Sequence, residues 1–175
     1  GYRTALDVSA AAGTMQTLFN DSVATNDAAV TAFSEIEKVV GTSGKDYIKG
    51  SSGADTITGG AGDDYISAGD GDDTIIAEDT DTKLDGGGGT DILSVAATFT
   101  SSTTDADVVN IETVTLSGSG NIDLVLLGQT EAFTINANAG ANEITGGQGV
   151  DTITLVTGAN ADIIHFGLFS ANGSD

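Results

Sequence analysis

The chain repeats itself every nine residues from Gly41 to Ser94, and this repeat limits what it can fold into more than any other feature. All six successive segments carry an aliphatic residue at the eighth position, and five of the six carry Gly at the fourth position and Asp at the sixth. The segments begin at Gly41, Gly50, Gly59, Ala68, Ala77 and Gly86. A short unit that recurs at a fixed period predicts a fold in which the copies stack on one another.

Each nonapeptide predicts a tight turn followed by a short strand. Gly permits the backbone conformations that a tight turn needs. Residues such as Thr56-Ile57-Thr58 are β-formers, and strand alternation directs the central apolar side chain inward. Two nonapeptides then complete one coil with a turn on each side, so that strands eighteen residues apart stack in parallel. The expected fold class is therefore all-β, a parallel β-solenoid.

This stacking brings acidic side chains together in the turns. Asp46 comes over Asp64, Asp55 over Asp73, and Asp73 over Asp91. Two like charges about 5 Å apart repel by ~1 kcal/mol in bulk water and by several times more near a protein surface, so a column of them opposes folding. A hard dication removes this repulsion, and Ca²⁺ prefers carboxylate and carbonyl oxygens. Mg²⁺ needs a stricter octahedron, and Zn²⁺ and Cu²⁺ prefer His or Cys, so the turns predict bound Ca²⁺.

The overall charge excludes several classes of partner. The chain has 26 acidic and 5 basic residues, for a net charge of −21. It therefore has no basic patch with which to bind nucleic acid or an anionic membrane surface. The apolar run Leu124 to Leu127 is far too short to cross a bilayer. The absence of Cys excludes disulfides and zinc thiolate sites.

Three segments follow the pattern GGxGxDxUx, where U is a large aliphatic residue. They are Gly59 to Ser67, Gly86 to Ser94 and Gly146 to Thr154. This pattern resembles the repeat-in-toxin (RTX) calcium-binding nonapeptide, and the segment Ile36 to Asp46 resembles the lead-in of such arrays. The resemblance implies a parallel β-roll with Ca²⁺ between successive turns on each side. It also implies secretion by a type I system, with folding outside the cell.

The resemblance further implies the calcium ligands. They are the sixth-position Asp side chains and the backbone carbonyls around the second and fourth positions. The corresponding residues are Thr42, Gly44, Asp46, Ser51, Gly53, Asp55, Gly60, Gly62, Asp64, Gly69, Gly71, Asp73, Gly87, Gly89, Asp91, Gly147, Gly149 and Asp151, with Asp162 as a further ligand near the C-terminus.

The repeat is interrupted in the middle of the array and after it. Ala77 to Asp85 has Thr82 at the sixth position, where Asp79 or Asp81 could take the place of the missing acid. After Val95 the nine-residue phase is lost. In-phase aliphatic residues resume only at Leu126, Ile135, Ile144 and Ile153.

The C-terminal patch contains one full repeat. Asn142 stands at a sixth position before it, and Asp162 follows after a two-residue shift. A further calcium ion there is one alternative, and a turn without metal is the other.

Four segments follow from these patterns. We expect an N-terminal β cap or interaction segment at 1–38, the calcium β-roll at 39–95, metal-free solenoid coils at 96–136, and a degenerate coil with the C-terminal segment at 137–175. Thr4 to Val8 suits a strand, which favours the β cap over a helical subdomain. Val108 to Gly118 resembles connecting segments of calcium-dependent bacterial surface-layer proteins.

Two functions fit the sequence, and neither is catalytic. His165 has no identifiable nucleophile or orienting acid, and calcium holds carboxylates ionised, which is the opposite of what a general acid needs. The first function is a calcium-rigidified extracellular structural module of a surface layer, filament or adhesin. Its partners would be copies of itself and a cell-surface polysaccharide. The second is the calcium-triggered folding and secretion module of a secreted enzyme or toxin.

Overall fold

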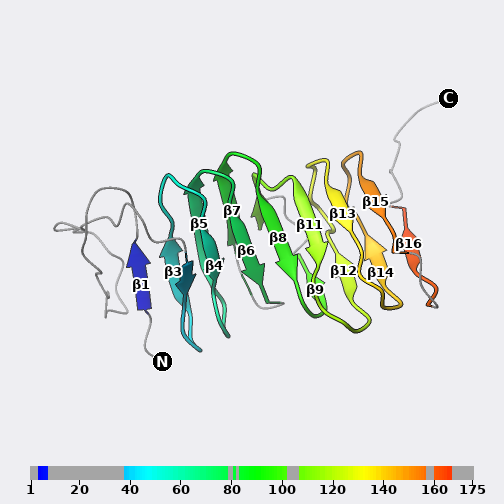
Figure 1. Ribbon diagram of the computed structural model, residues 1–175, viewed down its shortest axis with the longest axis horizontal. Coiled ribbons are helices and arrows are strands. Elements are labelled where there is room, and N and C mark those ends of the chain that lie inside the picture. The colour runs from blue at the N-terminus through cyan, green and yellow to red at the C-terminus, as the bar shows by residue number, and fades with distance from the viewer. Residues whose placement is uncertain are drawn as a thin grey trace.

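The computed structural model describes residues 4–7, 38–78, 81, 83–101, 107–156 and 160–166. All the regular structure in these residues is β-strand, and the strands lie side by side along one elongated body in nearly the order of the chain (Figure 1). The described part contains no helix of the length and apolarity needed to span a membrane. The prediction of an all-β parallel solenoid is confirmed.

Three parallel sheets form the walls of the solenoid. The first contains β1 (Thr4–Asp7), β3 (Asp46–Lys49), β5 (Tyr65–Asp70), β7 (Lys83–Gly88) and β10 (Val108–Val109). The second runs the length of the molecule and contains β2 (Lys38–Val40), β4 (Thr56–Thr58), β6 (Thr74–Ala77), β8 (Ile92–Val95), β11 (Thr113–Leu116), β13 (Thr134–Asn136) and β15 (Thr152–Thr154). The third contains β9 (Phe99–Thr100), β12 (Asp123–Val125), β14 (Glu143–Thr145) and β16 (Ile163–His165).

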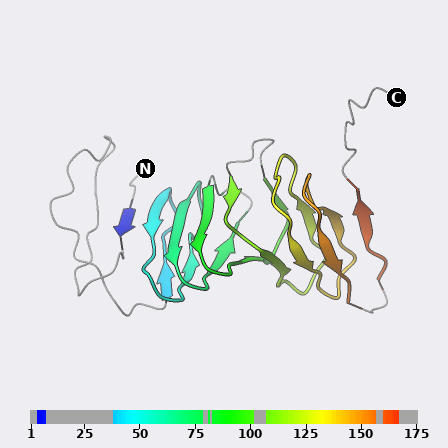
Figure 2. The ribbon, with the colours of Figure 1, turned by 90° about the horizontal axis from the view of Figure 1, so that it is seen from above.

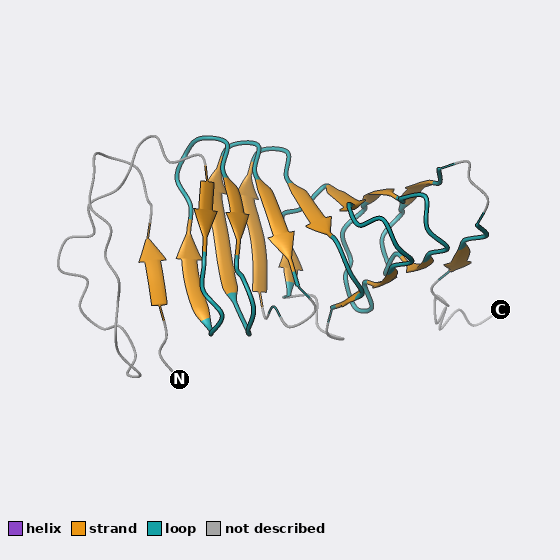
Figure 3. Cartoon of the chain, turned by 60° about the horizontal axis from the view of Figure 1, so that its bottom comes forward, coloured by secondary structure: helices purple, strands orange, loops and turns teal. Residues whose placement is uncertain are grey.

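Within the repeats the strands pair at the expected spacing of eighteen residues. Ile48 is the register partner of Ile66, which in turn pairs with Leu84. On the opposite sheet Ile57 pairs with Ile75. Two nonapeptides therefore make one coil, as predicted. Figure 2 shows the strand layers from above, and Figure 3 shows the loops that join them.

The core is a ladder of aliphatic side chains between the sheets. The repeat's eighth-position residues are almost fully buried, and the buried cluster continues through Val114 and Ile135 to Ile144. Alternation explains this ladder, because in a strand such as Thr56–Thr58 only the central side chain faces inward. The expected continuation of the solenoid beyond the repeats is thus confirmed.

The coils lengthen after the repeats, where the first sheet ends and the third begins. Leu84 pairs with Val108 and Leu93 pairs with Val114, which are separations of 24 and 21 residues in place of 18. In the third sheet Leu124 pairs with Ile144. Leu126, which the nine-residue phase places eighteen residues before Ile144, is buried in the core but is not the register partner of Ile144. The inserted residues lie in the connections, and the aliphatic ladder continues regardless of coil length.

Near the N-terminus β1 adds a strand to the first sheet, with Thr4 as the partner of Asp46. This strand falls where the sequence suited one. The rest of the expected N-terminal cap, residues 8–37, lies outside the described residues.

Candidate metal centre

The turns of the roll depend on Gly where one coil lies directly on the next. Gly60 has a φ of +96°, and a Cβ added there would lie 1.9 Å from the carbonyl oxygen of Thr42 in the preceding coil. Gly62, Gly69, Gly71, Gly87, Gly89 and Gly147 also have positive φ, whereas Gly44, Gly53 and Gly149 do not. The backbone of one turn therefore lies directly against the carbonyl groups of the neighbouring coil.

All five sixth-position Asp residues of the roll are buried, and Asp64, Asp73 and Asp91 each accept a hydrogen bond from the coil before them. The backbone N–H of Asp46 donates to Oδ1 of Asp64 at 2.8 Å. The N–H of Asp55 donates to Oδ1 of Asp73 at 2.7 Å, and the N–H of Asp73 donates to Oδ1 of Asp91 at 2.7 Å. All five residues are at most 3% exposed. The stacking of acidic residues predicted from the spacing is therefore present on both sides of the roll.

In four of these five residues one carboxylate oxygen has no hydrogen-bond donor. Oδ2 of Asp64, Asp73 and Asp91 and Oδ1 of Asp46 are buried without a partner. A charged oxygen that is buried without a partner costs several kcal/mol, because it has lost its hydration and gained no hydrogen bond in return. Burial raises the pKa of Asp73 to about 6, and also raises the pKa of Asp64 and Asp91. A cation bound between the turns would give these oxygens the partner that no hydrogen-bond donor supplies.

The chemistry of the turns fits Ca²⁺. Among the residues that the structure describes, no three His, Cys, Asp or Glu side chains lie close enough together to hold a metal by themselves. The oxygens that the turns offer are those of the buried carboxylates and of the backbone carbonyls that lie against the turn glycines. Such flexible oxygen sets suit Ca²⁺ better than Mg²⁺.

The first turn on each side differs from those that follow, because Thr42 and Ser51 replace the second-position Gly. Oδ2 of Asp46 accepts hydrogen bonds from the backbone N–H and the hydroxyl of Thr42. Oδ2 of Asp55 accepts the same pair from Ser51, at 2.7 and 3.0 Å. In these two first turns, Thr42 and Ser51 therefore supply hydrogen-bond donors to the carboxylate. Their own carbonyl oxygens accept the N–H groups of Ala61 and Asp70 in the next coil.

In the interrupted repeat, Asp81 lies beside Asp64. Burial, together with the nearby charge of Asp64, raises the pKa of Asp81 to about 7, although hydrogen bonds from the backbone amides of Glu78 and Asp64 lower it. Oδ1 of Asp81 is also buried without a partner, while Oδ2 accepts the N–H of Glu78 at 2.9 Å. Of the two replacements considered for Thr82, Asp81 therefore stands where a ligand is needed. Asp79 lies outside the described residues.

The C-terminal turns are built differently from the roll. Oδ1 of Asp151 accepts the N–H of Phe133 at 2.9 Å, so the residue stacked on Asp151 is apolar. Asp162 receives two donors from Asn142, its backbone N–H at 2.9 Å and its side-chain amide at 3.0 Å. The Asn142 amide thus gives Asp162 a neutral partner, and neither turn brings two carboxylates together as the roll does.

Sequence reasoning missed Glu112. Its Oε2 accepts the backbone N–H of Asp91 at 2.7 Å, in the manner of a sixth-position Asp from the following coil. One signal could have found it: Glu112 directly precedes Thr113-Val114-Thr115 and so stands two residues before an aliphatic residue, as each sixth-position Asp does. The signal is easily overlooked because the turn before Glu112 contains no Gly.

Comparison with known proteins agrees with this geometry. Residues 40–75 and 134–155 match the family model of the RTX calcium-binding nonapeptide repeat in four copies. No curated protein and no solved structure matches the chain. The matched segments cover about a third of the chain and contain the turns from Gly41 to Asp73 and the turn that ends at Asp151.

Proposed function

Since the chain belongs to the RTX family of calcium-binding β-roll proteins, we propose that it is an extracellular structural module that folds on Ca²⁺ and then self-assembles at a cell surface. One observation carries the proposal: in the stacked turns, Asp46, Asp64, Asp73 and Asp91 are buried and each keeps one carboxylate oxygen without a donor. The RTX β-roll is a structural calcium-binding domain, and no catalytic step is part of the proposal.

Calcium supplies the positive charge that the stacked turns need. The chain's own residues do the rest: Asp64, Asp73 and Asp91 present one oxygen each, and the Gly turns bring the carbonyls of neighbouring coils together. A site filled at 10 to 100 times its dissociation constant stabilises the folded state by about 1.4 to 2.7 kcal/mol. Extracellular calcium sites typically bind at ~0.1–1 mM, so about 10 mM calcium reaches this range of filling. RTX proteins are typically secreted, which supports a location outside the cell.

Self-assembly is supported by the end of the described solenoid. β15 and β16 are the last strands of their sheets, and an edge strand offers unpaired backbone groups to another chain. Ile163, the first residue of β16, is 54% exposed, and Phe166, which directly follows β16, is 85% exposed. A second copy that stacked on this end would continue both sheets and cover these side chains. A cell-surface polysaccharide is the further partner we propose for such an assembly.

Electron microscopy of the purified chain, with and without millimolar Ca²⁺, tests the assembly. We expect sheets or filaments only with Ca²⁺. Ile163→Lys, a charge on the edge strand β16, should abolish them and leave calcium-dependent folding intact. Thr134→Lys, on the inner strand β13, serves as the control. Monomers that persist in Ca²⁺ while still folding on it would refute assembly and favour the folding and secretion module of a secreted enzyme or toxin.

A further inference from the structure

The last repeat ends against a coil that lacks the repeat, and Glu112 joins the two. Its Oε2 lies 2.7 Å from the backbone nitrogen of Asp91. The corresponding distances from Asp46 to Asp64 and from Asp55 to Asp73 are 2.8 and 2.7 Å. The coil is 21 residues long here, and the longer side chain of Glu reaches the point that Asp reaches across eighteen. Glu112 thus occupies the position of a sixth-position Asp.

The rest of this turn is also arranged like the repeats. A Cβ built on Gly86 would lie 2.5 Å from Oδ2 of Asp91 and 2.1 Å from the carbonyl oxygen of Asn110. A Cβ built on Gly41, in the first repeat, meets Oδ2 of Asp46 at 2.7 Å and the carbonyl oxygen of Gly59 at 2.0 Å. Asp91 is 1% exposed, and its buried Oδ2 has no hydrogen-bond donor. An unpartnered carboxylate oxygen and a carbonyl oxygen therefore lie against the same face of Gly86.

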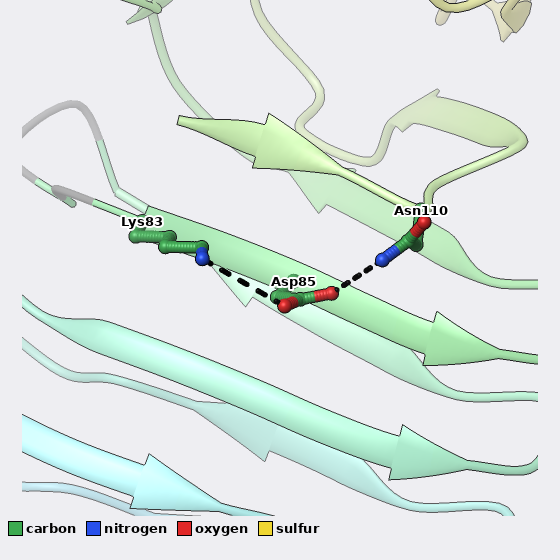
Figure 4. A network of polar contacts seen from close by, with 3 residues as sticks. All are labelled: Lys83, Asp85 and Asn110. Carbon is green, nitrogen blue, oxygen red and sulfur yellow. Dashed lines mark hydrogen bonds and ion pairs between the residues drawn. The ribbon is translucent and has the colours of Figure 1, made fainter. Parts of the chain in front are cut away.

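A polar network holds Asn110 in the conformation that this arrangement needs. Asn110 has a φ of +53°, and it is the one residue besides Gly with positive φ in the described part of the chain. Its side-chain amide donates to Oδ1 of Asp85 at 2.8 Å, and Nζ of Lys83 lies 3.9 Å from Oδ2 of Asp85 (Figure 4). Asn tolerates the left-handed region better than most residues, so it can stand here in place of a turn Gly.

We propose that Asp91, Glu112 and the carbonyl oxygen of Asn110 form a further calcium site, which joins the last repeat to the first coil without a repeat. The donors are hard oxygens, two of them from carboxylates, as Ca²⁺ prefers. The inference rests on calcium binding by the repeats and extends the metal column one coil beyond them. This site lies where the first sheet ends at β10 and the third has begun at β9, so calcium there would stiffen the change of coil shape.

Glu112→Gln in the full chain tests the site. The amide oxygen of Gln can still accept the N–H of Asp91, but the charge is lost. We expect one fewer Ca²⁺ bound per chain by isothermal titration calorimetry. The NMR amide signals of Asp91 and Asn110 should shift on calcium binding in the wild type and should no longer do so in the variant. Glu143→Gln, the same change on the exposed face of β14, should leave the number of ions unchanged.

A second variant distinguishes the loss of this calcium site from misfolding of the chain. Asp85→Ala removes the partner of Asn110 without touching either carboxylate of the site, and should weaken binding at this one site about tenfold. If Glu112→Gln binds as many ions as the wild type, or Asp85→Ala binds them all as tightly, the site does not exist. A wild-type chain that binds no Ca²⁺ would instead refute the proposed function itself.

Discussion

At the scale of single residues, Asp64, Asp73 and Asp91 each bond to the coil before them through one carboxylate oxygen and keep the other buried without a donor. Asp73 is bonded to the coils on both sides of it, because its Oδ1 accepts the N–H of Asp55 and its own N–H donates to Asp91. It therefore belongs to two stacked turn pairs. Neither Asp46 nor Asp91 lies between two Asp turns in this way, since Asp46 has Thr42 as its donor and Asp91 is followed by Glu112.

Asp73→Ala should therefore be among the most damaging single changes in the array. It removes a ligand from two sites and leaves the N–H of Asp55 buried without an acceptor, at a total cost of at least about 3 kcal/mol in saturating Ca²⁺. For a chain of this size the melting temperature should fall by about 6 to 12 °C. Asp63→Ala, in an exposed turn position, is the control. Equal melting temperatures for the two variants would show that the stacked column does not contribute.

The pKa of Asp73 predicts how the metal-free fold responds to pH. Burial raises this pKa to about 6 in the folded chain, from an ordinary value of 3.8. The folded state then binds more protons than the unfolded state between these values, so its stability increases as pH falls and decreases as pH rises through about 6. Urea unfolding of the chain freed of Ca²⁺ beforehand on a chelating resin should give a larger free energy of unfolding at pH 5 than at pH 7.5.

Asp73→Asn removes this titrating group and should reduce the difference between the two pH values. Relief of the repulsion among the chain's many acids acts in the same direction and remains in the variant. A metal-free wild type that loses stability between pH 7.5 and pH 5 would contradict the assignment of Asp73 as a buried, unpaired carboxyl.

At the scale of elements, each turn must let the next coil lie directly on it. Gly60 makes this possible, because any side chain there would overlap the carbonyl of Thr42. Gly120 lies in a loop of the later coils, where a Cβ would meet nothing within 4 Å. Comparing a substitution at Gly60 with one at Gly120 therefore distinguishes the effect of close stacking from the ordinary effect of replacing Gly.

Gly60→Ala should destabilise the chain by more than about 2 kcal/mol, because the left-handed conformation alone costs 1–2 kcal/mol for an L-residue. Gly120→Ala should change the free energy of unfolding by no more than about 0.5 kcal/mol. Chemical unfolding in Ca²⁺ measures both. If the two variants are equally stable, the coils do not stack as closely as the turn geometry requires.

The roll could be predicted from the sequence because its period is regular. Eighteen residues per coil fixed both the pairing of Ile48 with Ile66 and the stacking of Asp46 on Asp64. The later coils could not be predicted in register, since extra residues in their loops leave the aliphatic ladder intact. For this reason Leu124, and not Leu126, pairs with Ile144. Glu112 was missed for a related reason, because its turn replaces Gly with Asn110.

At the scale of the whole molecule, the solenoid has one continuous hydrophobic core and two kinds of coil. In the roll, buried carboxylates on both sides oppose the stacking that the aliphatic ladder favours. In the later coils, Asn142 and Phe133 replace carboxylates at the stacked positions, and the turns close with fewer charges. Calcium should therefore decide the stability of the N-terminal part of the solenoid more than that of the C-terminal part.

Far-UV circular dichroism with a thermal melt, in millimolar Ca²⁺ and in EGTA, tests the central claim most directly. With Ca²⁺ we predict a β spectrum and a cooperative melt, because each filled turn site adds about 1.4 to 2.7 kcal/mol. In EGTA the β signal should be largely lost or should melt at a much lower temperature. A β signal and melting temperature that are the same in both conditions would contradict calcium-dependent folding.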